Sequence, residues 1–399
     1  MSGPAAIPAS PSAPRKLRIA VFNRTFSSTG GGAERYSIAL VEQLAASHEI
    51  HVFAQEIDHQ WPGVSYHRVS APLRKPRWIN QLWFATATWW ATRRGFDVVH
   101  SHENTWHGDV QTVHVLPVRY NLFHGRSGWR LFLRGVKVVT SPRLLTYLGL
   151  EYLRYVSRPG RQVVVTSPSL QAIMAASYPA CLGSVTVITP GITMPLPVTP
   201  MRKGAARAHL GLPPTAPCLL FVANDYRKKG LQALLAALVH LPSDVVLAVV
   251  GHTAQIPLFR ERVSALKLEE RVFFLGSLKE MGLAYEAADC LVHPTLEDTF
   301  AMVVLEAMAH GLPVVVSAPR YCGISGLLTQ GVNAQILNDP LDAPALARSL
   351  REVLEQPSLA AALGQGATAF AMGYQWRELA LRQEVLYFSV LAEKVARPS

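Results

Sequence analysis

The stretch 293–317, HPTLEDTFAMVVLEAMAHGLPVVVS, decides the fold class. Its order of apolar and polar residues predicts a strand end, a polar loop, a helix and a second buried strand. Gly311 stands where a helix ends in the left-handed conformation, and Pro313 prevents the helix from continuing. A helix enclosed between two apolar strands is typical of a parallel α/β sheet.

Strand-length apolar runs alternate with helical segments such as 33–46 and 231–241 along the rest of the chain. The runs form two series, which are separated by residues 190–200, PGITMPLPVTP, with four prolines. Because proline lacks a backbone donor and fixes φ, we expect this segment to be a connector. The sequence therefore predicts two doubly wound, Rossmann-like α/β domains that face a central cleft. The expected strands are 17–22, 50–53, 98–100, 163–166 and 185–188 in the first series and 219–222, 245–250, 272–275, 290–293 and 313–316 in the second.

The expected domain boundaries follow from this division. Residues 1–16 are rich in Pro, Ala and Ser and lack the apolar core of a signal peptide, so we expect a disordered tail. An N-terminal domain over 17–190, a Pro-rich linker at 191–200 and a C-terminal domain over 201–375 follow. Residues 376–399 have a helical pattern and are polar enough to pack on either domain.

Charge is distributed unevenly over the 399 residues. Residues 1–199 contain 20 Lys or Arg and 9 Asp or Glu, whereas residues 200–399 contain 18 of each. A hydrophobic content of 49% excludes a disordered protein, and four widely spaced cysteines indicate free thiols in a reducing compartment. No apolar run reaches the ~20 residues of a membrane-spanning helix. We therefore expect a cytoplasmic protein, or one that lies on a membrane surface without crossing it.

The helix expected after residue 299 has its N-terminus at the cleft, where free amides and the helix dipole favour an anion such as a diphosphate. Asp298 or Thr299 would cap this helix. Asp298 and Glu306 are eight residues apart, so both side chains can face one pocket. Glu306 follows an apolar run, where a carboxylate is costly unless it binds something such as the vicinal hydroxyls of a ribose. The alternative is an amphipathic helix with an exposed glutamate.

Two further loops follow expected strands. In 221–235, FVANDYRKKGLQALL, three cations precede a helix N-terminus and suit a nucleotide diphosphate, although a solvated turn is the alternative. In 29–34, TGGGAE, glycines allow backbone amides to approach phosphate or sugar closely, but the GxGxxG spacing of a dinucleotide site is absent. Four histidines within 100–114 lack HExxH spacing, and the chain contains no Asp-x-Asp, so we expect no metal site.

These motifs together resemble those of the retaining glycosyltransferases of family 4, which have the GT-B fold. That family has two acids eight residues apart, followed by Ala, Gly and Pro; Glu306 is the second acid, followed here by Ala307, Gly311 and Pro313. Either Asp298, in register, or Glu297, one residue earlier, would be the first acid. The resemblance further covers the Lys-Gly pair after the cationic loop and the Gly-Gly-Ala-Glu-Arg sequence at 31–35.

The resemblance implies a role for each candidate residue. Glu306 would bind the donor's ribose and Asp298 the hydroxyls of its sugar, next to the helix N-terminus. Lys229 and its neighbours would bind the diphosphate, and His114 would line the reaction centre. The implied catalytic residues are His114, Asp298 and Lys229, and the implied nucleotide-sugar ligands are Gly31, Gly32, Arg227, Lys228, Lys229, Gly276, Leu278, Asp298, Thr299, Phe300, Ala301 and Glu306, with Gly276 and Leu278 flanking the base.

A basic, aromatic surface is expected on the N-terminal domain. Residues 68–94 carry six Lys or Arg and no acid, and residues 119–161 carry nine against Glu151 alone, with aromatic residues interleaved. Such a surface suits anionic headgroups with rings at the interface. No nucleic-acid-binding motif accompanies it, so we expect a membrane surface and not nucleic acid as the partner.

The resulting expectation is a retaining glycosyltransferase that needs neither a metal nor another cofactor. It would move a sugar from a nucleotide-diphosphate sugar to a glycan or lipid-linked acceptor at the inner face of the cell membrane, most closely resembling bacterial enzymes of lipopolysaccharide or other cell-surface polysaccharide biosynthesis. Two alternatives are a sugar-nucleotide epimerase of the same fold and a non-catalytic, membrane-binding sugar-nucleotide protein. The sequence does not identify the nucleotide, the sugar or the acceptor.

Overall fold

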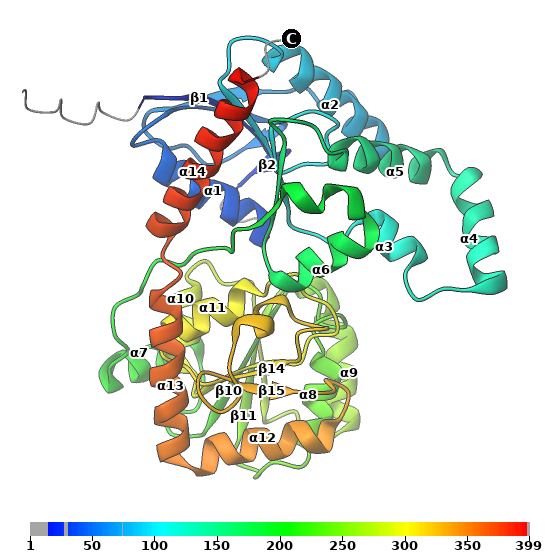
Figure 1. Ribbon diagram of the computed structural model, residues 1–399. Coiled ribbons are helices and arrows are strands. Elements are labelled where there is room, and N and C mark those ends of the chain that lie inside the picture. The colour runs from blue at the N-terminus through cyan, green and yellow to red at the C-terminus, as the bar shows by residue number, and fades with distance from the viewer. Residues whose placement is uncertain (1–14, 28–30, 74, 397–399) are drawn as a thin grey trace, which may run out of the picture.

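The computed structural model describes residues 15–27, 31–73 and 75–396. Most of the expected tail and two residues of the glycine loop, Thr29 and Gly30, lie outside the described residues. The chain forms two α/β domains, one above the other in Figure 1, and each contains a parallel sheet flanked by helices. The predicted fold class, two doubly wound domains, is confirmed.

The N-terminal domain contains a seven-stranded sheet in the order β5-β3-β1-β6-β7-β8-β9. All the pairs are parallel. The chain runs from β1 outward through β3 to β5 and then returns to β6, on the other side of β1. Its strands are β1 (Arg18–Phe22), β3 (Glu49–Ala54), β5 (Val64–Arg68), β6 (Val98–Ser101), β7 (Val110–Val113), β8 (Gln162–Val165) and β9 (Val185–Val187), beside a small pair β2 (Thr25–Phe26) and β4 (Glu56–Ile57). Its helices are α1 (Gly32–Leu44), α2 (Arg77–Thr92), α3 (Val118–Phe123), α4 (Gly128–Val139), α5 (Pro142–Tyr155) and α6 (Pro168–Ser177).

The C-terminal domain contains a six-stranded parallel sheet in the order β12-β11-β10-β13-β14-β15. Its central strands β10 and β13 are buried along their whole length, because helices cover both faces of the sheet. Its strands are β10 (Cys218–Ala223), β11 (Val246–Gly251), β12 (Val272–Gly276), β13 (Cys290–His293), β14 (Val314–Ser317) and β15 (Gln335–Leu337). Its helices are α7 (Pro200–Leu210), α8 (Leu231–Leu238), α9 (Ile256–Ala265), α10 (Met281–Ala287), α11 (Met302–Ala309), α12 (Ala343–Glu355) and α13 (Pro357–Met372).

The last helix, α14 (Trp376–Val395), returns to the N-terminal domain. Tyr387 and Val390 are fully buried in the core of that domain, and the Tyr387 hydroxyl lies 2.7 Å from Nδ1 of His100. Ile192 of the linker donates its amide to the carbonyl of Tyr374 just before α14. The two connections between the domains therefore lie side by side, as a hinge requires.

All ten expected strands are present, although their ends differ by a residue or so. The ten expected strands do not include β2, β4, β5, β7 and β15, of which β5 and β15 are edge strands of the two large sheets. An edge strand has solvent on one side, so its apolar pattern is weak; β5 is exposed at three of its five residues. Among the described residues, no helix is both long enough and apolar enough to cross a membrane.

Candidate functional site

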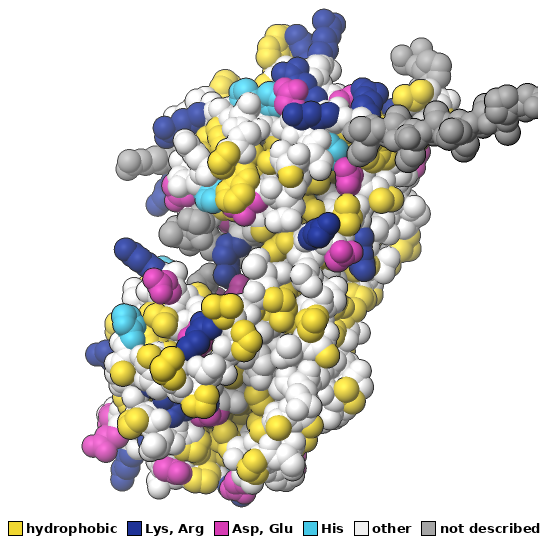
Figure 2. All heavy atoms as spheres, turned by 90° about the vertical axis from the view of Figure 1, so that its left-hand side faces the viewer, with side chains coloured by type: hydrophobic (Ala, Val, Ile, Leu, Met, Phe, Trp, Pro, Cys, Tyr) yellow, Lys and Arg dark blue, Asp and Glu magenta, His cyan; other side chains and the backbone are white. Residues whose placement is uncertain are grey.

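Three loops of the C-terminal domain meet where strands β10, β12 and β13 end. Because the strands are parallel, their carboxyl ends share one edge of the sheet, and this edge faces the N-terminal domain. Figure 2 shows the molecular surface indented between the two domains. The candidate site contains residues from both domains, which contact each other across this boundary.

The centre of the site is the carboxylate of Asp298, in the loop after β13. Nζ of Lys229 donates to Oδ2 of Asp298 at 2.7 Å, and Nε2 of His293 lies 3.2 Å from the same oxygen. Burial would raise the pKa of the Asp298 carboxyl, but the hydrogen bond from His293 and the charge of Lys229 outweigh it and hold this pKa well below its usual range. Asp298 therefore stays ionised as a fixed acceptor.

Of the two acids that the sequence left open, Asp298 occupies the interior position. Glu297 has a side chain that is 45% exposed and pairs with exposed Lys228, 3.2 Å away. Arg227, the third cation of the loop, is exposed, and its side chain forms no ion pair with a described residue. The structure thus brings Lys229 and Asp298 together and leaves Arg227 at the surface.

A glycine holds the cationic loop against the loop that follows β13. Gly230 has φ +83°, and a Cβ atom there would lie 1.9 Å from the carbonyl oxygen of Pro294. The amide of Leu296 donates to the carbonyl of Lys228 at 2.8 Å in the same region. Only glycine fits this close approach, which places Lys229 beside Asp298.

The start of helix α11 corrects the expected cap. Neither Asp298 nor Thr299 caps the helix, which is preceded by Ala301 and has no side-chain cap. Instead, Oδ1 of Asp298 accepts from the amides of Phe300, at 3.3 Å, and Ala301, at 2.9 Å. Ala301 has φ +74°, a left-handed conformation in which an alanine is strained. Glycine adopts this conformation without strain, so an alanine here has a structural cost.

Glu306 lies eight residues after Asp298, in helix α11, and its carboxylate contacts the N-terminal domain. Its Oε1 lies 2.9 Å from Nη1 of Arg35 in the first turn of α1, and its Oε2 accepts from the hydroxyl of Tyr285 at 2.6 Å. The side chain of Glu306 is only 12% exposed. The carboxylate expected to bind a ribose is therefore at the domain interface, with one partner from each domain.

The N-terminal wall of the site contacts the same segment of the C-terminal domain. Oγ1 of Thr299 donates to the carbonyl of His114, and Oγ of Ser167 donates to the carbonyl of Thr299, both at 2.7 Å. Nε2 of His114 lies 2.9 Å from Nδ1 of His102. Burial, together with the charge of a nearby arginine, lowers the pKa of His114 to about 3, so its ring is neutral near pH 7.

The other predicted residues lie around this centre. Gly31 directly precedes α1 and Gly32 is its first residue, on the N-terminal side. Gly276 ends β12 with φ +69°, and Leu278 is partly buried just beyond it. Five contacting residues were not among the predicted site residues. Tyr285 and Ser167 carried no signal in the sequence. The other three lie in segments that the sequence analysis considered: Arg35 ends the Gly-Gly-Ala-Glu-Arg motif, His102 is one of the four histidines within 100–114, and His293 begins the 293–317 stretch. 

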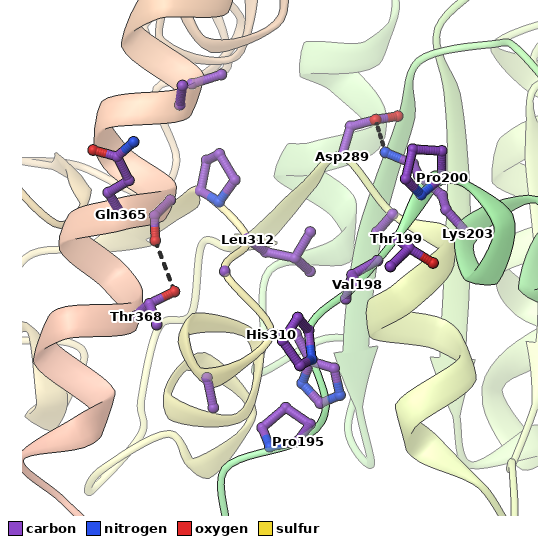
Figure 3. A pocket seen from close by; sticks show the side chains of 18 of the residues that line it. Pro195, Val198, Thr199, Pro200, Lys203, Asp289, His310, Leu312, Gln365 and Thr368 are labelled. Carbon is purple, nitrogen blue, oxygen red and sulfur yellow. Dashed lines mark hydrogen bonds and ion pairs between the residues drawn. The ribbon is translucent and has the colours of Figure 1, made fainter.

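Another cavity lies outside this site. A groove of about 1300 Å³ runs between the linker, α7 and α13, and none of the predicted site residues lines it. Figure 3 shows Lys203 and Asp289 paired on one side and Gln365 and Thr368 on the other. Among the described residues, no three His, Cys, Asp or Glu side chains gather as a metal site.

Each of the two domains matches a family model built from known proteins. The family model described as Glycosyltransferase Family 4 matches residues 30–194, and the one described as Glycosyl transferases group 1 matches residues 203–370. A D-inositol 3-phosphate glycosyltransferase from Xylanimonas cellulosilytica is 31% identical over 254 residues, which cover 59% of this chain and 60% of that protein. A second, from Thermobispora bispora, is 33% identical and is matched over 52% of its length. The chain thus spans between half and three fifths of these two relatives.

A longer match and two solved structures extend the likeness over the chain. A D-inositol 3-phosphate glycosyltransferase from Arthrobacter sp. is 27% identical over 89% of each chain. WaaG, a glycosyltransferase involved in lipopolysaccharide biosynthesis, superposes with a TM-score of 0.79 at 20% identity over 92% of this chain and 98% of its own. Anabaena HepE in complex with UDP-glucose superposes with a TM-score of 0.72 at 18% identity over 95% and 99%. The N-terminal domain therefore matches the Glycosyltransferase Family 4 model and the C-terminal domain the Glycosyl transferases group 1 model, and together they have the two-domain GT-B fold of WaaG and HepE.

Proposed function

We propose that the protein transfers a sugar from a nucleotide-diphosphate sugar to a glycan or lipid-linked acceptor, with retention of the anomeric configuration. One observation carries the proposal: the pairs Lys229–Asp298 and Arg35–Glu306 place charged groups from both domains at one cleft. Cations there suit a diphosphate, and carboxylates suit the hydroxyls of a ribose and a sugar. The donor would lie on the C-terminal wall and the acceptor on the N-terminal wall.

The proposed roles follow from the contacts. Lys229, with Lys228 beside it, would stabilise the negative charge that develops on the leaving diphosphate. Glu306 would accept from the ribose hydroxyls, and Asp298, held ionised, would accept from a hydroxyl of the transferred sugar. His114, neutral near pH 7, would line the reaction centre and donate or accept a hydrogen bond there. Because lysines supply the charge at the diphosphate, the reaction would need no metal ion.

A panel of donors tests this function. The pure protein is incubated with UDP-, GDP- and ADP-sugars, starting from UDP-glucose because the HepE neighbour was crystallised with it. Each donor is tested with and without acceptor and in excess EDTA. Acceptor-dependent release of nucleotide in the presence of EDTA supports the proposal. Isomerised sugar without acceptor indicates an epimerase, binding without turnover indicates a non-catalytic protein, and loss in EDTA rescued by a divalent ion contradicts the metal-free mechanism.

The acceptor is proposed to be anchored at an anionic membrane surface, because helix α4 stands apart from the N-terminal sheet in Figure 1. One side of this helix presents exposed apolar residues at helical spacing, with Trp129 69% and Phe132 59% exposed and their rings stacked. The other side carries Arg130, Arg134 and Lys137 at i, i+4 and i+7. A helix with this division lies in the plane of a membrane interface.

Vesicle co-sedimentation tests the membrane proposal. Binding should be strong on anionic vesicles and weak on zwitterionic ones, and salt should reduce it. Replacing the three cations of α4 by glutamine should weaken binding about 100-fold, since each is worth about 1 kcal/mol near an anionic surface. Leu381→Ser with Val385→Ser, at exposed positions of α14, is the matched control and should change nothing. Equal partitioning to both vesicle types, or none, would contradict the proposal.

The names of the relatives suggest a second acceptor. Several of the curated relatives are D-inositol 3-phosphate glycosyltransferases, so this small phosphorylated acceptor belongs in the panel beside the lipid-linked one. Turnover with inositol 3-phosphate and none with a lipid-linked glycan would identify a soluble acceptor. The N-terminal cations that form no ion pair with a described residue would then bind the phosphate of the acceptor and not a lipid surface.

A further inference from the structure

Arg35 connects the two walls of the cleft. It lies in the first turn of α1, and its Nη1 binds Oε1 of Glu306 at 2.9 Å on the opposite domain. The second oxygen of Glu306 accepts from the Tyr285 hydroxyl. Each oxygen of the proposed ribose-binding carboxylate thus has a donor from the protein in this structure.

The guanidinium of Arg35 is not fully satisfied by this contact. Its Nε is buried and has no hydrogen-bond partner among the described residues. A buried donor without an acceptor costs free energy, so a ligand that supplies an acceptor to this Nε would stabilise the complex. Guanidinium has donors in a fixed fork that matches the oxygens of a phosphate, and it binds them in pairs.

The cations on the opposite wall are arranged differently. Lys229 is held by Asp298 and by the carbonyl of Glu297, each at 2.7 Å, within one domain. Arg35 instead reaches across the cleft from the N-terminal domain, and its partner is the residue that the ribose would need. A diphosphate between these walls would meet Lys229 on one side and Arg35 on the other.

We propose that Arg35 is the donor-sensing residue of the N-terminal domain. When no donor is bound, the guanidinium of Arg35 pairs with the carboxylate of Glu306. When a nucleoside diphosphate binds, this guanidinium moves to the diphosphate, and the carboxylate of Glu306 is free to accept hydrogen bonds from the ribose. This inference rests on the proposed function. A nucleoside alone must displace Arg35 and offers it no phosphate in return, so Arg35 makes the site selective for diphosphates over nucleosides.

Calorimetric titrations of the full-length chain with uridine and UDP, adenosine and ADP, and guanosine and GDP test this. For the base that the wild type binds, Arg35→Gln should tighten nucleoside binding about 5-fold and weaken diphosphate binding about 10-fold. Arg35→Lys keeps the positive charge but not the paired donors of the guanidinium. It should give a ratio of diphosphate to nucleoside affinity between those of the wild type and Arg35→Gln. Arg93→Gln, an exposed arginine on the N-terminal domain, is the control and should leave both affinities unchanged.

The outcomes separate this inference from the function on which it rests. Equal losses of nucleoside and diphosphate affinity in Arg35→Gln, or no change in either, would overturn the inference while the proposed function stands. Tighter binding of both would also overturn it, because the diphosphate would then gain nothing from Arg35. If the wild type binds none of the six probes, the proposed function itself fails.

Discussion

The two domains share an architecture, but Lys203, Arg207 and Lys229 of the C-terminal domain are partnered differently from the cations on helix α4 of the N-terminal domain. In the C-terminal domain, Lys229 pairs with Asp298, and Lys203 and Arg207 both pair with Asp289. In the N-terminal domain, the cations of α4 form no ion pair with a described residue. The overall composition has the same contrast, since residues 1–199 carry 20 basic and 9 acidic side chains and residues 200–399 carry 18 of each.

This difference separates two ways of binding an anion. A cation that is fixed by a carboxylate in its own domain offers a preorganised position, and little reorganisation is needed when charge develops beside it. A cation without an internal partner on an exposed helix offers charge but no fixed geometry, which suits a surface more than a single ligand. The contrast supports the proposals that the C-terminal domain binds one small donor and that the N-terminal domain binds an anionic surface.

The largest expected effect comes from removing the preorganised cation of the C-terminal domain, Lys229. Lys229→Ala should reduce turnover about 100- to 1,000-fold, the cost of removing one preorganised donor from a developing oxyanion. Nucleoside diphosphate binding should weaken, whereas nucleoside binding should change little, because the diphosphate alone loses its partner. Steady-state kinetics and calorimetry measure both. Lys228→Ala, at an exposed position, is the control with the smaller effect, and equal losses for nucleoside and diphosphate would remove Lys229 from the diphosphate site.

Glu306→Gln tests the acid on the same wall. We expect donor binding to weaken and turnover to fall about 100-fold, since charge-assisted hydrogen bonds from ribose hydroxyls are worth about 1.5–3 kcal/mol. The amide keeps the size of the side chain, so the fold should persist in circular dichroism. Wild-type kinetics in a folded variant would show that Glu306 does not contact the donor.

An acid titration should distinguish the domains by stability. Burial lowers the pKa of His100, in the N-terminal core, from 6.5 to about 3. The unfolded chain therefore binds a proton that the folded chain does not, so stability should fall as the pH drops from about 6.5 towards 3, by about 1.4 kcal/mol per pH unit for this group. Asp298 acts in the same sense but at lower pH, because its pKa is also lowered by its partners, so its contribution to stability is lost only below about pH 4, the ordinary range of an aspartate.

Urea unfolding followed by tryptophan fluorescence between pH 7 and pH 5 measures this slope. All eight tryptophans lie within residues 61–129 or at position 376, so the signal reports the N-terminal domain and the helix packed on it. His100→Gln should lower stability at pH 7 and flatten the pH dependence by one proton. An unchanged slope in that variant would show that His100 is not the group responsible.

The smallest expected effect concerns Ala301. Because an alanine at φ +74° is strained by about 1–2 kcal/mol, and glycine loses more backbone entropy on folding by roughly 0.5–1 kcal/mol, Ala301→Gly should stabilise the C-terminal domain by about 0.5–1 kcal/mol. Thermal unfolding monitored by circular dichroism measures the difference. Ala287→Gly, within helix α10, is the control and should destabilise. A less stable Ala301→Gly variant would show that the left-handed residue is not strained.

Much of the fold could be predicted because its signals are local. The ten expected strands were found from buried apolar runs, which parallel sheets covered on both faces require. Lys229 was predicted as a site residue because the Lys-Gly pair after the cationic loop is a short motif of the family that the sequence resembles. The edge strand β5 was missed because three of its five residues are exposed and its apolar pattern is weak. The expected cap at Asp298 was wrong because its oxygen accepts from the amides of the turn before the helix instead.

The sequence by itself determined the two-domain architecture, the position of the linker and the family, because these depend on apolar periodicity and on motifs whose residues are close neighbours in the chain. Only the tertiary structure decided which charges meet. Arg35 and Glu306 are separated by most of the chain, and Tyr285 lies on another helix. Their contact depends on how two sheets face each other and on α14 returning to the first domain, and no local spacing encodes a distance across a cleft.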